Sequence, residues 1–548
     1  MLKYITPPAL SLAIIAGATT HAAQYELAPN PNPGQNVITV ASNDLAINTA
    51  EPFTNGGGII VQGNATLRNV TEMDIVFDED KSGGLSYMTI QLGATLEILK
   101  KSKMNFDTAS HFSVQGIVNN RGKIGSSSSI QLGQTSLFNN FGTLRNKRGA
   151  TLRGQFENHG TLVNATAVSS AGGFFQQIGQ LVNHTQATIT NQGYFLNFRT
   201  ITNRGKITNS VIGSSGRGRG FFRNMGTIDN QATGEITNRQ RWFNTGTLNN
   251  AGYFLNHAAG LGLSNDRGEI HNLAGGTFQN DKALNSNSLI TNAGTFIITG
   301  RKLPGFGLNS TAPYTQTNGK TILEGTLKAS IITIKKGILS GAGQIQGPTH
   351  IEQNAILEIG QDIASLAFSE NLTLQGNLKM DIEQQEVTDD ITISQTLTLG
   401  QNSILTINFP TEFTPTISQT FDIIQTQKIK GQFSKIQVNT PLDGVFQPIY
   451  LVDQIDQMDQ IRLIYQPDIL TGDLTGDRVV DEADLQTVKN AIGSIYSLSD
   501  LFDVRNFFNQ SPNSISPQET THTNIPEPTT LAIISLLNAT LLLKRKKR

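Results

Sequence analysis

Asn140-Phe141-Gly142-Thr143-Leu144-Arg145-Asn146 is one copy of a pattern that recurs through the middle of the chain. Each copy places a glycine two residues after an asparagine, followed by an aliphatic residue and a second asparagine, and further copies occupy 158–164, 203–209, 224–230 and 244–250. The glycines at 122, 142 and 160, and again at 205, 226, 246 and 268, stand 18 to 22 residues apart. A near-constant step of this length is typical of one turn of a solenoid. Residues 119–300 are therefore predicted to form a stack of regular coils.

The pattern also predicts how each coil is built. A strand of three to five residues alternates its side chains, so the aliphatic residue points inward and its neighbours point outward. We expect glycine and asparagine to supply positive φ angles at the corners. Stacking would then bring the aliphatic residues into one interior column, formed by Leu144, Leu162, Ile207, Ile228 and Leu248. The predicted fold class is all-β, a right-handed parallel β-helix. A β-sandwich is the alternative, because short strands with glycine turns also build sandwiches.

The composition of the chain is polar but weakly charged. Of 548 residues, 15% are charged, the formal net charge is -1, and there is no cysteine. Without cysteine, neither disulfides nor thiolate metal sites support the fold, so burial of apolar residues must stabilise it. The regular return of apolar residues argues against disorder.

The near-zero net charge hides two oppositely charged regions. Residues 119–300 contain 16 Lys and Arg against 6 Asp and Glu, whereas residues 351–500 contain 7 against 22. One interpretation is two solvated surfaces of unequal charge. The other is a cationic surface for an acidic polysaccharide or for released nucleic acid. Its members would be Arg145, Lys147, Arg148, Arg153, Arg217, Arg219, Arg223, Arg239 and Arg241.

The segments around the regular coils complete the predicted organisation. Residues 1–22 combine Lys3, an apolar run and a small-residue end, which predicts a secretory signal peptide. We expect an N-terminal cap and irregular coils over 23–118, regular repeats over 119–300, and a continued β-helix over 301–465. The continuation, with 337–345 and 420–424 as examples, resembles the passenger-like β-helices of autotransporters and of many secreted bacterial surface proteins.

An acidic loop near the C-terminus carries the sharpest chemical signal. In Gly472-Asp473-Leu474-Thr475-Gly476-Asp477-Arg478-Val479-Val480-Asp481-Glu482-Ala483-Asp484, oxygen ligands recur at the spacing that Ca²⁺ requires, with a backbone carbonyl from Val479. The loop resembles the calcium loop of a dockerin repeat. That resemblance implies a small α-helical module over 466–510, one weak Ca²⁺ site and a cohesin-like partner. The implied ligands are Asp473, Thr475, Asp477, Val479, Asp481 and Asp484.

Two departures from that pattern keep an alternative open. Thr475 stands where Asn or Asp is commoner, and Arg478 stands where glycine usually makes the sharp turn of such a loop. The second half of the module retains a similar helix, but residues 493–499 are too few for another calcium loop. The alternative is a decayed helical hairpin that binds no ion.

The C-terminal tail has three parts in a fixed order. After a polar linker over 511–524, Pro526-Glu527-Pro528 precedes an apolar run over 529–543 and five basic residues over 544–548. Residues 525–548 thus resemble the PEP-CTERM sorting signal. The resemblance implies cleavage near Pro526 by a membrane exosortase, transient membrane association, and export to the surface or exopolysaccharide matrix of a Gram-negative bacterium. A simple tail anchor is the alternative.

Catalytic residues are not marked by any motif in the sequence. β-Helices also host polysaccharide lyases and glycosidases, which need carboxylates paired with each other or with a cation on one face. The carboxylates of the regular region are scattered over separate coils, although stacking could bring Asp229 to Glu235, and the histidines at 159, 184, 257 and 271 are equally dispersed. We therefore expect a secreted, non-enzymatic structural or adhesive protein. A polysaccharide-acting β-helix enzyme is the alternative.

Overall fold

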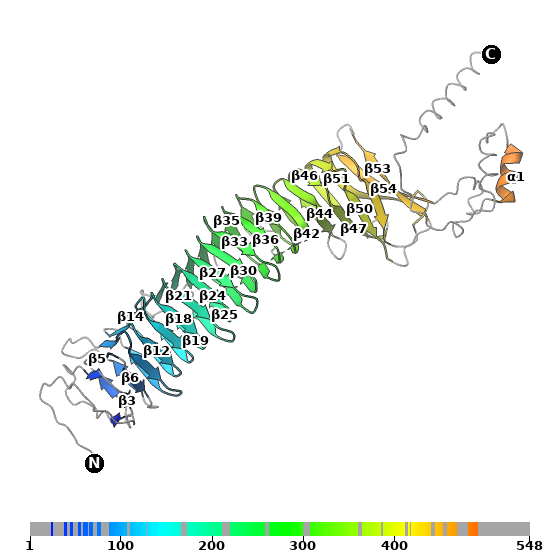
Figure 1. Ribbon diagram of the computed structural model, residues 1–548. Helices are drawn as coiled ribbons and strands as arrows, with labels where there is room; N and C mark the ends of the chain where they lie inside the picture. The colour runs from blue at the N-terminus through cyan, green and yellow to red at the C-terminus, as the bar shows by residue number, and fades with distance from the viewer. Residues whose placement is uncertain are drawn as a thin grey trace. The chain divides into compact units, whose positions relative to one another are not determined.

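The computed structural model consists almost entirely of short strands (Figure 1). It describes residues 23–25, 38–40, 44–47, 53–55, 58–63, 65–69, 74–77, 87–106, 110–127, 129–165, 173–210, 220–257, 262–299, 307–359, 364–384, 387–410, 415–416, 418–439, 444–452, 458–467 and 481–491.

Through the regular coils, each strand pairs in parallel with the strand three places later in the chain. One coil consists of β17 (Gly149–Leu152), β18 (Gln155–Asn158) and β19 (Thr161–Asn164). These strands pair with the next coil, β20 (Phe174–Gln177), β21 (Gln180–Asn183) and β22 (Thr188–Asn191). The coils therefore build three ladders, which we call face 1 (containing β17), face 2 (containing β18) and face 3 (containing β19). The predicted parallel β-solenoid is confirmed, and the antiparallel sandwich is excluded.

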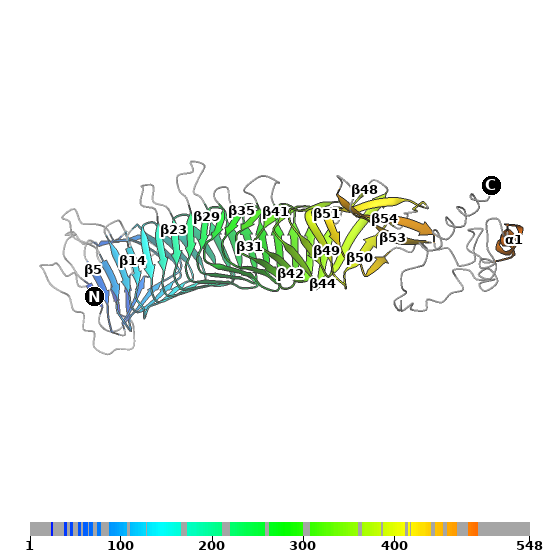
Figure 2. The same cartoon turned by 90° about the horizontal axis from the view of Figure 1, so that it is seen from above.

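The strands of each face follow one another along the stack, and Figure 2 shows β14, β23, β29 and β35 of face 1 in this order. Face 1 continues through β14 (Ser129–Leu132), β23 (Tyr194–Asn197), β26 (Phe221–Asn224), β29 (Arg241–Asn244), β32 (Leu263–Asn265) and β35 (Ala283–Ser286). Face 2 contains β12 (Ile117–Asn120), β15 (Leu137–Asn140), β24 (Thr200–Asn203), β27 (Thr227–Asn230), β30 (Thr247–Asn250), β33 (Glu269–Asn272) and β36 (Ile290–Asn292). Face 3 contains β13 (Lys123–Ser126), β16 (Thr143–Asn146), β25 (Lys206–Asn209), β28 (Glu235–Asn238), β31 (Tyr253–Asn256), β34 (Thr277–Asn280) and β37 (Thr295–Ile298).

Similar strands precede and follow these coils. The first ones are β1 (Ala23–Tyr25), β2 (Ile38–Val40), β3 (Asp44–Ile47), β4 (Phe53–Asn55), β5 (Gly58–Val61), β6 (Thr66–Asn69), β7 (Asp74–Phe77), β8 (Tyr87–Ile90), β9 (Thr95–Ile98), β10 (Lys103–Phe106) and β11 (His111–Val114). The later ones are β38 (Gly307–Ser310), β39 (Tyr314–Gln316), β40 (Lys320–Leu323), β41 (Thr326–Lys328), β42 (Ile332–Gly341), β43 (Gln344–Gln346), β44 (Thr349–Ile359), β45 (Ser365–Phe368), β46 (Leu372–Leu374), β47 (Asn377–Gln384), β48 (Val387–Thr388), β49 (Asp390–Leu399), β50 (Ile404–Asn408), β51 (Thr420–Lys430), β52 (Lys435–Val438), β53 (Gly444–Leu451) and β54 (Asp459–Pro467).

The interior is filled by apolar side chains stacked from coil to coil. On face 1, Phe175, Phe195, Phe222 and Trp242 are fully buried, and their rings stack with centroids 4.7, 4.7 and 4.0 Å apart. The single column predicted from the repeat is wrong: Leu144, Leu162 and Ile207 lie on face 3, whereas Ile228 and Leu248 lie on face 2. The reason is that the repeat glycines do not all occupy the same corner of the coil. Those at 122, 142, 160 and 205 precede face 3 strands, and those at 226, 246 and 268 precede face 2 strands.

The repeat glycines are needed for close packing of the coils, not for an unusual backbone angle. None of the repeat glycines or asparagines has a positive φ, so the predicted corner role is wrong. A Cβ atom on Gly142 would lie 2.0 Å from the carbonyl oxygen of Gly122, and one on Gly246 would lie 2.0 Å from that of Gly226. A side chain at these corners would therefore collide with the backbone of the preceding coil.

Buried asparagines form a hydrogen-bonded ladder on each face. Each Nδ2 donates to the Oδ1 of the asparagine one coil later, at 2.7–2.9 Å. The face 2 ladder is Asn120, Asn140, Asn158, Asn183, Asn203, Asn230, Asn250, Asn272 and Asn292. The face 3 ladder is Asn146, Asn164, Asn191, Asn209, Asn238, Asn256 and Asn280. The face 1 ladder is Asn197, Asn224, Asn244 and Asn265.

The direction of each ladder is fixed by a second hydrogen bond. Asn140 Nδ2 also donates to the carbonyl oxygen of Thr161, at 3.0 Å, and most other rungs make an equivalent bond to the backbone. The Oδ1 of each later rung accepts from the preceding coil, so the first rung lacks that donor. Asn120 Oδ1 and Asn146 Oδ1, which begin the face 2 and face 3 ladders, are accordingly buried without a hydrogen-bond partner. On face 1 the first rung is Asn197, whose Oδ1 accepts from the backbone N–H of Arg199, and Gln177 one coil earlier donates its Nε2 to backbone carbonyls instead. The ladders thus satisfy their own interior amides except where they begin.

The stack changes character towards its C-terminal end. β42 pairs with β39 and β40 together, so a single strand runs through a corner. β51 then receives β54 as an antiparallel partner. The ring of Phe446, in β53, stacks on Phe409 with centroids 4.8 Å apart. The antiparallel strand pairs an edge of the sheet, and sheet edges are otherwise prone to aggregation.

The chain divides into two compact units, residues 1–441 with 446–464 and residues 442–445 with 465–548. In the second unit the structure describes one helix, α1 (Glu482–Ala491). This single helix leaves the two-helix dockerin-like module a prediction. Among the described residues, no helix combines the length and apolar character needed to cross a membrane.

Candidate functional site

The residues predicted from motifs lie largely outside the described part of the chain. This holds for the calcium ligands Asp473, Thr475, Asp477 and Val479, and for the sorting motif Pro526, Glu527 and Pro528. Asp481 precedes α1, and its Oδ1 accepts a hydrogen bond of 2.7 Å from the backbone N–H of Ala483. Asp484 lies within α1. Asp481 therefore caps the helix at its N-terminus, and the calcium site itself stays a prediction.

The described residues contain one group with the spacing of a metal site, at the corner between faces 2 and 3. The residue after each face 2 asparagine donates its backbone N–H to the carbonyl oxygen of the asparagine one coil earlier. His159 N–H donates to the Asn140 carbonyl and His184 N–H to the Asn158 carbonyl, both at 2.8 Å. The imidazole rings of His159 and His184 consequently stack, with centroids 3.8 Å apart. Phe141 continues this row, 4.5 Å from His159.

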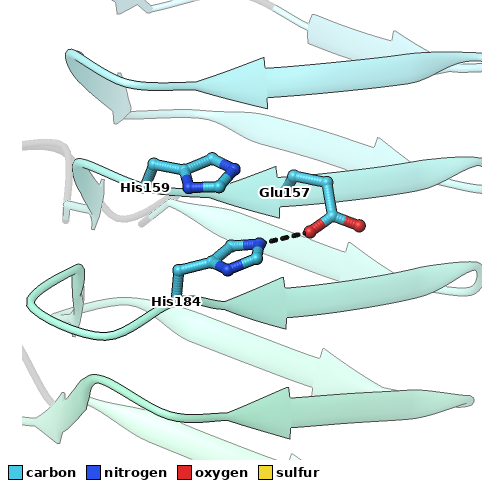
Figure 3. Close-up of side chains that lie close together, drawn as sticks. All are labelled: Glu157, His159 and His184. Carbon is cyan, nitrogen blue, oxygen red and sulfur yellow. Dashed lines mark hydrogen bonds and ion pairs between the residues drawn. The ribbon is translucent and has the colours of Figure 1, made fainter.

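Glu157 faces this corner from β18 (Figure 3). Its Oε2 lies 2.6 Å from His184 Nε2, and its Oε1 accepts a hydrogen bond of 2.5 Å from Gln155 Nε2. One ligand atom from each of Glu157, His159 and His184 falls within 4.8 Å of the others. We call these three residues the corner cluster.

The electrostatics of the corner cluster favour an uncharged His159. Although His159 is largely exposed, its partial burial lowers its pKa below the usual value, the neighbouring His184 lowers it further by electrostatic repulsion, and Glu157 partly opposes both effects. A neutral imidazole keeps a lone pair that can accept a proton or bind a metal ion.

The sequence prediction treated these histidines as dispersed, and the structure corrects it. His159 and His184 are 25 residues apart but occupy equivalent places in adjacent coils, since each directly follows a face 2 asparagine. Aligning the sequence on those asparagines would have found the pair. The suggested meeting of Asp229 with Glu235 is wrong, because β27 and β28 place them on faces 2 and 3.

The predicted cationic residues fall into a clearer arrangement than the sequence indicated. On face 1, from β17 to β29, the outward positions carry Phe174, Tyr194, Phe221, Arg223, Arg241 and Phe243. The flanking corners add Lys147, Arg148, Arg153, Arg199 and Arg239, all exposed. These eleven residues we call the basic–aromatic face. Arg145 lies on face 3, and Arg217 and Arg219 lie outside the described residues.

The basic–aromatic face lacks negative charge of its own. No aspartate or glutamate occurs in its five strands or in the segments that lead into and out of them. Phe174 and Tyr194 are 39% and 50% exposed, which is unusual for large apolar side chains. The Arg241 guanidinium lies over the Phe243 ring, 4.6 Å from its centroid. This surface therefore offers aromatic and cationic groups together.

No known protein-family model matches the chain, and no curated protein matches it in sequence.

Proposed function

We propose that this protein is a secreted, non-enzymatic structural or adhesive scaffold that binds an acidic polysaccharide along its basic–aromatic face. The observation that carries the proposal is the exclusion of carboxylates from this face, while Glu157, Asp229 and Glu235 in the same coils lie on the other two. A surface that is rich in cations and has no aspartate or glutamate in its own strands favours a polymer with repeated negative charges.

The aromatic residues favour a sugar polymer over a nucleic acid. The rings of Tyr194, Phe221 and Phe243 lie against one another, with centroids 5.3 and 5.4 Å apart. Single-stranded nucleic acids bind by stacking each base on an aromatic face, and rings already in mutual contact leave no gap between them for a base. This row of rings, exposed at Tyr194 and half-buried at Phe221 and Phe243, still offers apolar contact to the C–H groups of sugars. Arg223 and Arg241, in the same strands, are placed to pair with the carboxylates of an acidic sugar.

Binding to immobilised polygalacturonate, a polymer of sugar carboxylates, tests this proposal. We expect Arg223→Glu with Arg241→Glu to weaken binding at least about tenfold, or about 1.4 kcal/mol. The control is Lys123→Glu with Arg145→Glu, which makes the same charge change on face 3 and should have a much smaller effect. Equal losses in both pairs would show only non-specific attraction. Tighter binding of single-stranded DNA than of polygalacturonate would identify nucleic acid as the ligand.

Export is the second part of the proposal. It is supported by the signal-peptide pattern of residues 1–22 and by the tripartite tail over 525–548, which resembles the substrates of an exosortase. Mass spectrometry of the protein from its native host should find a mature form that begins after Ala22 or Ala23 and ends near Pro526. A mature form that still ends at Arg548 would argue for a tail anchor.

A polysaccharide-acting enzyme remains the alternative function. The described His–carboxylate contacts, His184 with Glu157, His257 with Asp281 and His271 with Glu269, are the groups that such chemistry could use. Incubation of the purified protein with acidic polysaccharides should release no new reducing or unsaturated ends. Their release, and its loss in a Glu157→Gln variant, would replace the scaffold proposal by an enzymatic one.

A further inference from the structure

We propose that Glu157, His159 and His184 bind a transition-metal ion, with Zn²⁺ as the reference ligand, on the outside of the solenoid corner. This inference is independent of polymer binding, because the corner cluster lies between faces 2 and 3 and the basic–aromatic face is face 1 with its adjoining corners.

The ligand types select the kind of metal. Two imidazoles and one carboxylate match the donor set of many zinc sites. Ca²⁺ prefers an all-oxygen shell, so the corner cluster does not suit it, whereas imidazole suits Zn²⁺, Cu²⁺ and Ni²⁺. His159 is exposed, so solvent can fill the remaining coordination position.

The distances fit a site that closes when the ion binds. Ligand atoms around a tetrahedral zinc lie about 3.4 Å apart, given bond lengths of about 2.0–2.2 Å. In the corner cluster the Glu157–His184 contact is 2.6 Å and the largest separation is within 4.8 Å. Shifts of about 1 Å would bring the three atoms to the required spacing. A metal ion binds in the plane of an imidazole, and the two rings now lie only 12° from parallel, so the exposed His159 ring must also rotate about its side-chain bonds to point its lone pair at the ion.

A neighbouring group supports the carboxylate. Gln155 Nε2 donates to Glu157 Oε1, which leaves Oε2 directed at the histidines. Outer hydrogen bonds of this kind orient metal ligands and raise affinity. The stack itself supplies further order, since the backbone hydrogen bonds of His159 and His184 hold the two imidazoles on consecutive coils.

The same solenoid contains a comparison site that lacks the second imidazole. His271 Nε2 lies 3.0 Å from Glu269 Oε2, and its Nδ1 lies 2.8 Å from Thr291 Oγ1. This pair repeats the His–Glu contact of the corner cluster without a stacked histidine. His271 is therefore a matched control for metal binding.

Calorimetric titration of the full chain with zinc chloride, after removal of bound metal by a chelator, tests the inference. The wild type should bind one equivalent that His184→Ala and His159→Ala each weaken at least about tenfold, because loss of a direct ligand should cost no less than loss of an outer-shell partner. His271→Ala should leave that equivalent unchanged. Circular dichroism spectra matching the wild type would show that the variants remain folded.

X-ray absorption at the zinc edge gives a second readout that does not depend on affinity. Two imidazole nitrogens in the first shell of the wild type, reduced to one in His184→Ala, would support the assignment. A wild-type protein that binds no zinc, or one whose zinc binding and spectrum are the same in His184→Ala, would overturn it. An equal loss in His271→Ala would also overturn it, because binding would then be spread over the surface histidines.

Discussion

At the scale of single residues, asparagine and glycine make the coil interior possible for different reasons. The asparagine amides are buried yet paired with the next coil and with the backbone, which avoids the cost of an unsatisfied polar group. The glycines let the chain of one coil approach the carbonyls of another. Their recurrence was visible in the sequence, but their roles were not, because a corner residue and an inward-facing strand end show the same spacing.

Replacing one rung should show what the ladder contributes. Asn203 Oδ1 accepts from Asn183 Nδ2 and Asn203 Nδ2 donates to Asn230 Oδ1, both at 2.7 Å. We expect Asn203→Ala to lower the free energy of unfolding by about 1–3 kcal/mol, since buried partners lose their hydrogen bonds. Urea unfolding followed by circular dichroism measures this. Thr202→Ala, on the outward side of the same strand, should change it by less than about 0.5 kcal/mol.

A pair of glycine substitutions separates close packing from general glycine effects. A Cβ on Gly246 would lie 2.0 Å from a backbone oxygen, whereas one on Gly149 would meet nothing within 4 Å. Gly246→Ala should destabilise the protein by about 1–3 kcal/mol or more through overpacking, and Gly149→Ala should be neutral or slightly stabilising. Thermal unfolding compares the two variants. Similar midpoints for both would contradict the close-packing explanation.

At the scale of strands, the length of a connecting loop decides which residues of the sequence stack in adjacent coils. Between β19 and β20 the chain includes residues 166–172, and the step from Asn158 to Asn183 rises to 25 residues, compared with 18 from Asn140 to Asn158. The regular period predicted the strands and their parallel stacking. It could not predict the corner cluster, because the longer connection changes the number of residues between equivalent positions in the sequence. In space, these positions still lie directly above one another. The two interior columns were merged in the prediction for a related reason, a change of corner by the repeat glycines.

The connection between β48 and β49 should make stability depend on pH. Asp389 is buried, its carboxylate accepts hydrogen bonds from the backbone N–H groups of Ala364 and Asp381, and burial raises its pKa to about 7. The folded protein therefore holds this proton between about pH 4 and 7, where the unfolded chain has released it. The bound proton stabilises the folded protein, and this stabilisation is fully present below the pKa that Asp389 has in the unfolded chain. It is lost as the pH rises through about 7, which lowers the free energy of unfolding by up to about 4 kcal/mol.

An Asp389→Asn variant provides the measurement for this effect. Its urea midpoint should vary less between pH 5 and pH 8 than that of the wild type, because the amide does not titrate. Equal pH dependence in both proteins would place the titrating group elsewhere.

At the scale of the whole molecule, the fold could be predicted further than the function. A repeated coil gives the same sequence pattern many times in a long chain, whereas the residues of a binding site occur in it only once. The calcium prediction belongs to this scale, because the loop at 472–484 falls in the second compact unit of the chain and would make that unit ion-dependent. Calorimetry of the full chain with calcium chloride should find one weak site that Asp477→Asn with Asp481→Asn abolishes. Absence of calcium-dependent heat in the wild type would favour the decayed hairpin.

The asparagine ladders have an electrical consequence for the solenoid. Every ladder amide points its oxygen towards the preceding coil and its nitrogen towards the following one, and the bonds to backbone carbonyls prevent an individual flip. Aligned peptide dipoles add in an α-helix, and these side-chain dipoles should add along the solenoid in the same way. The three rows therefore give the stack a partial negative pole near their first rungs, Asn120, Asn146 and Asn197, and a partial positive pole near their last rungs.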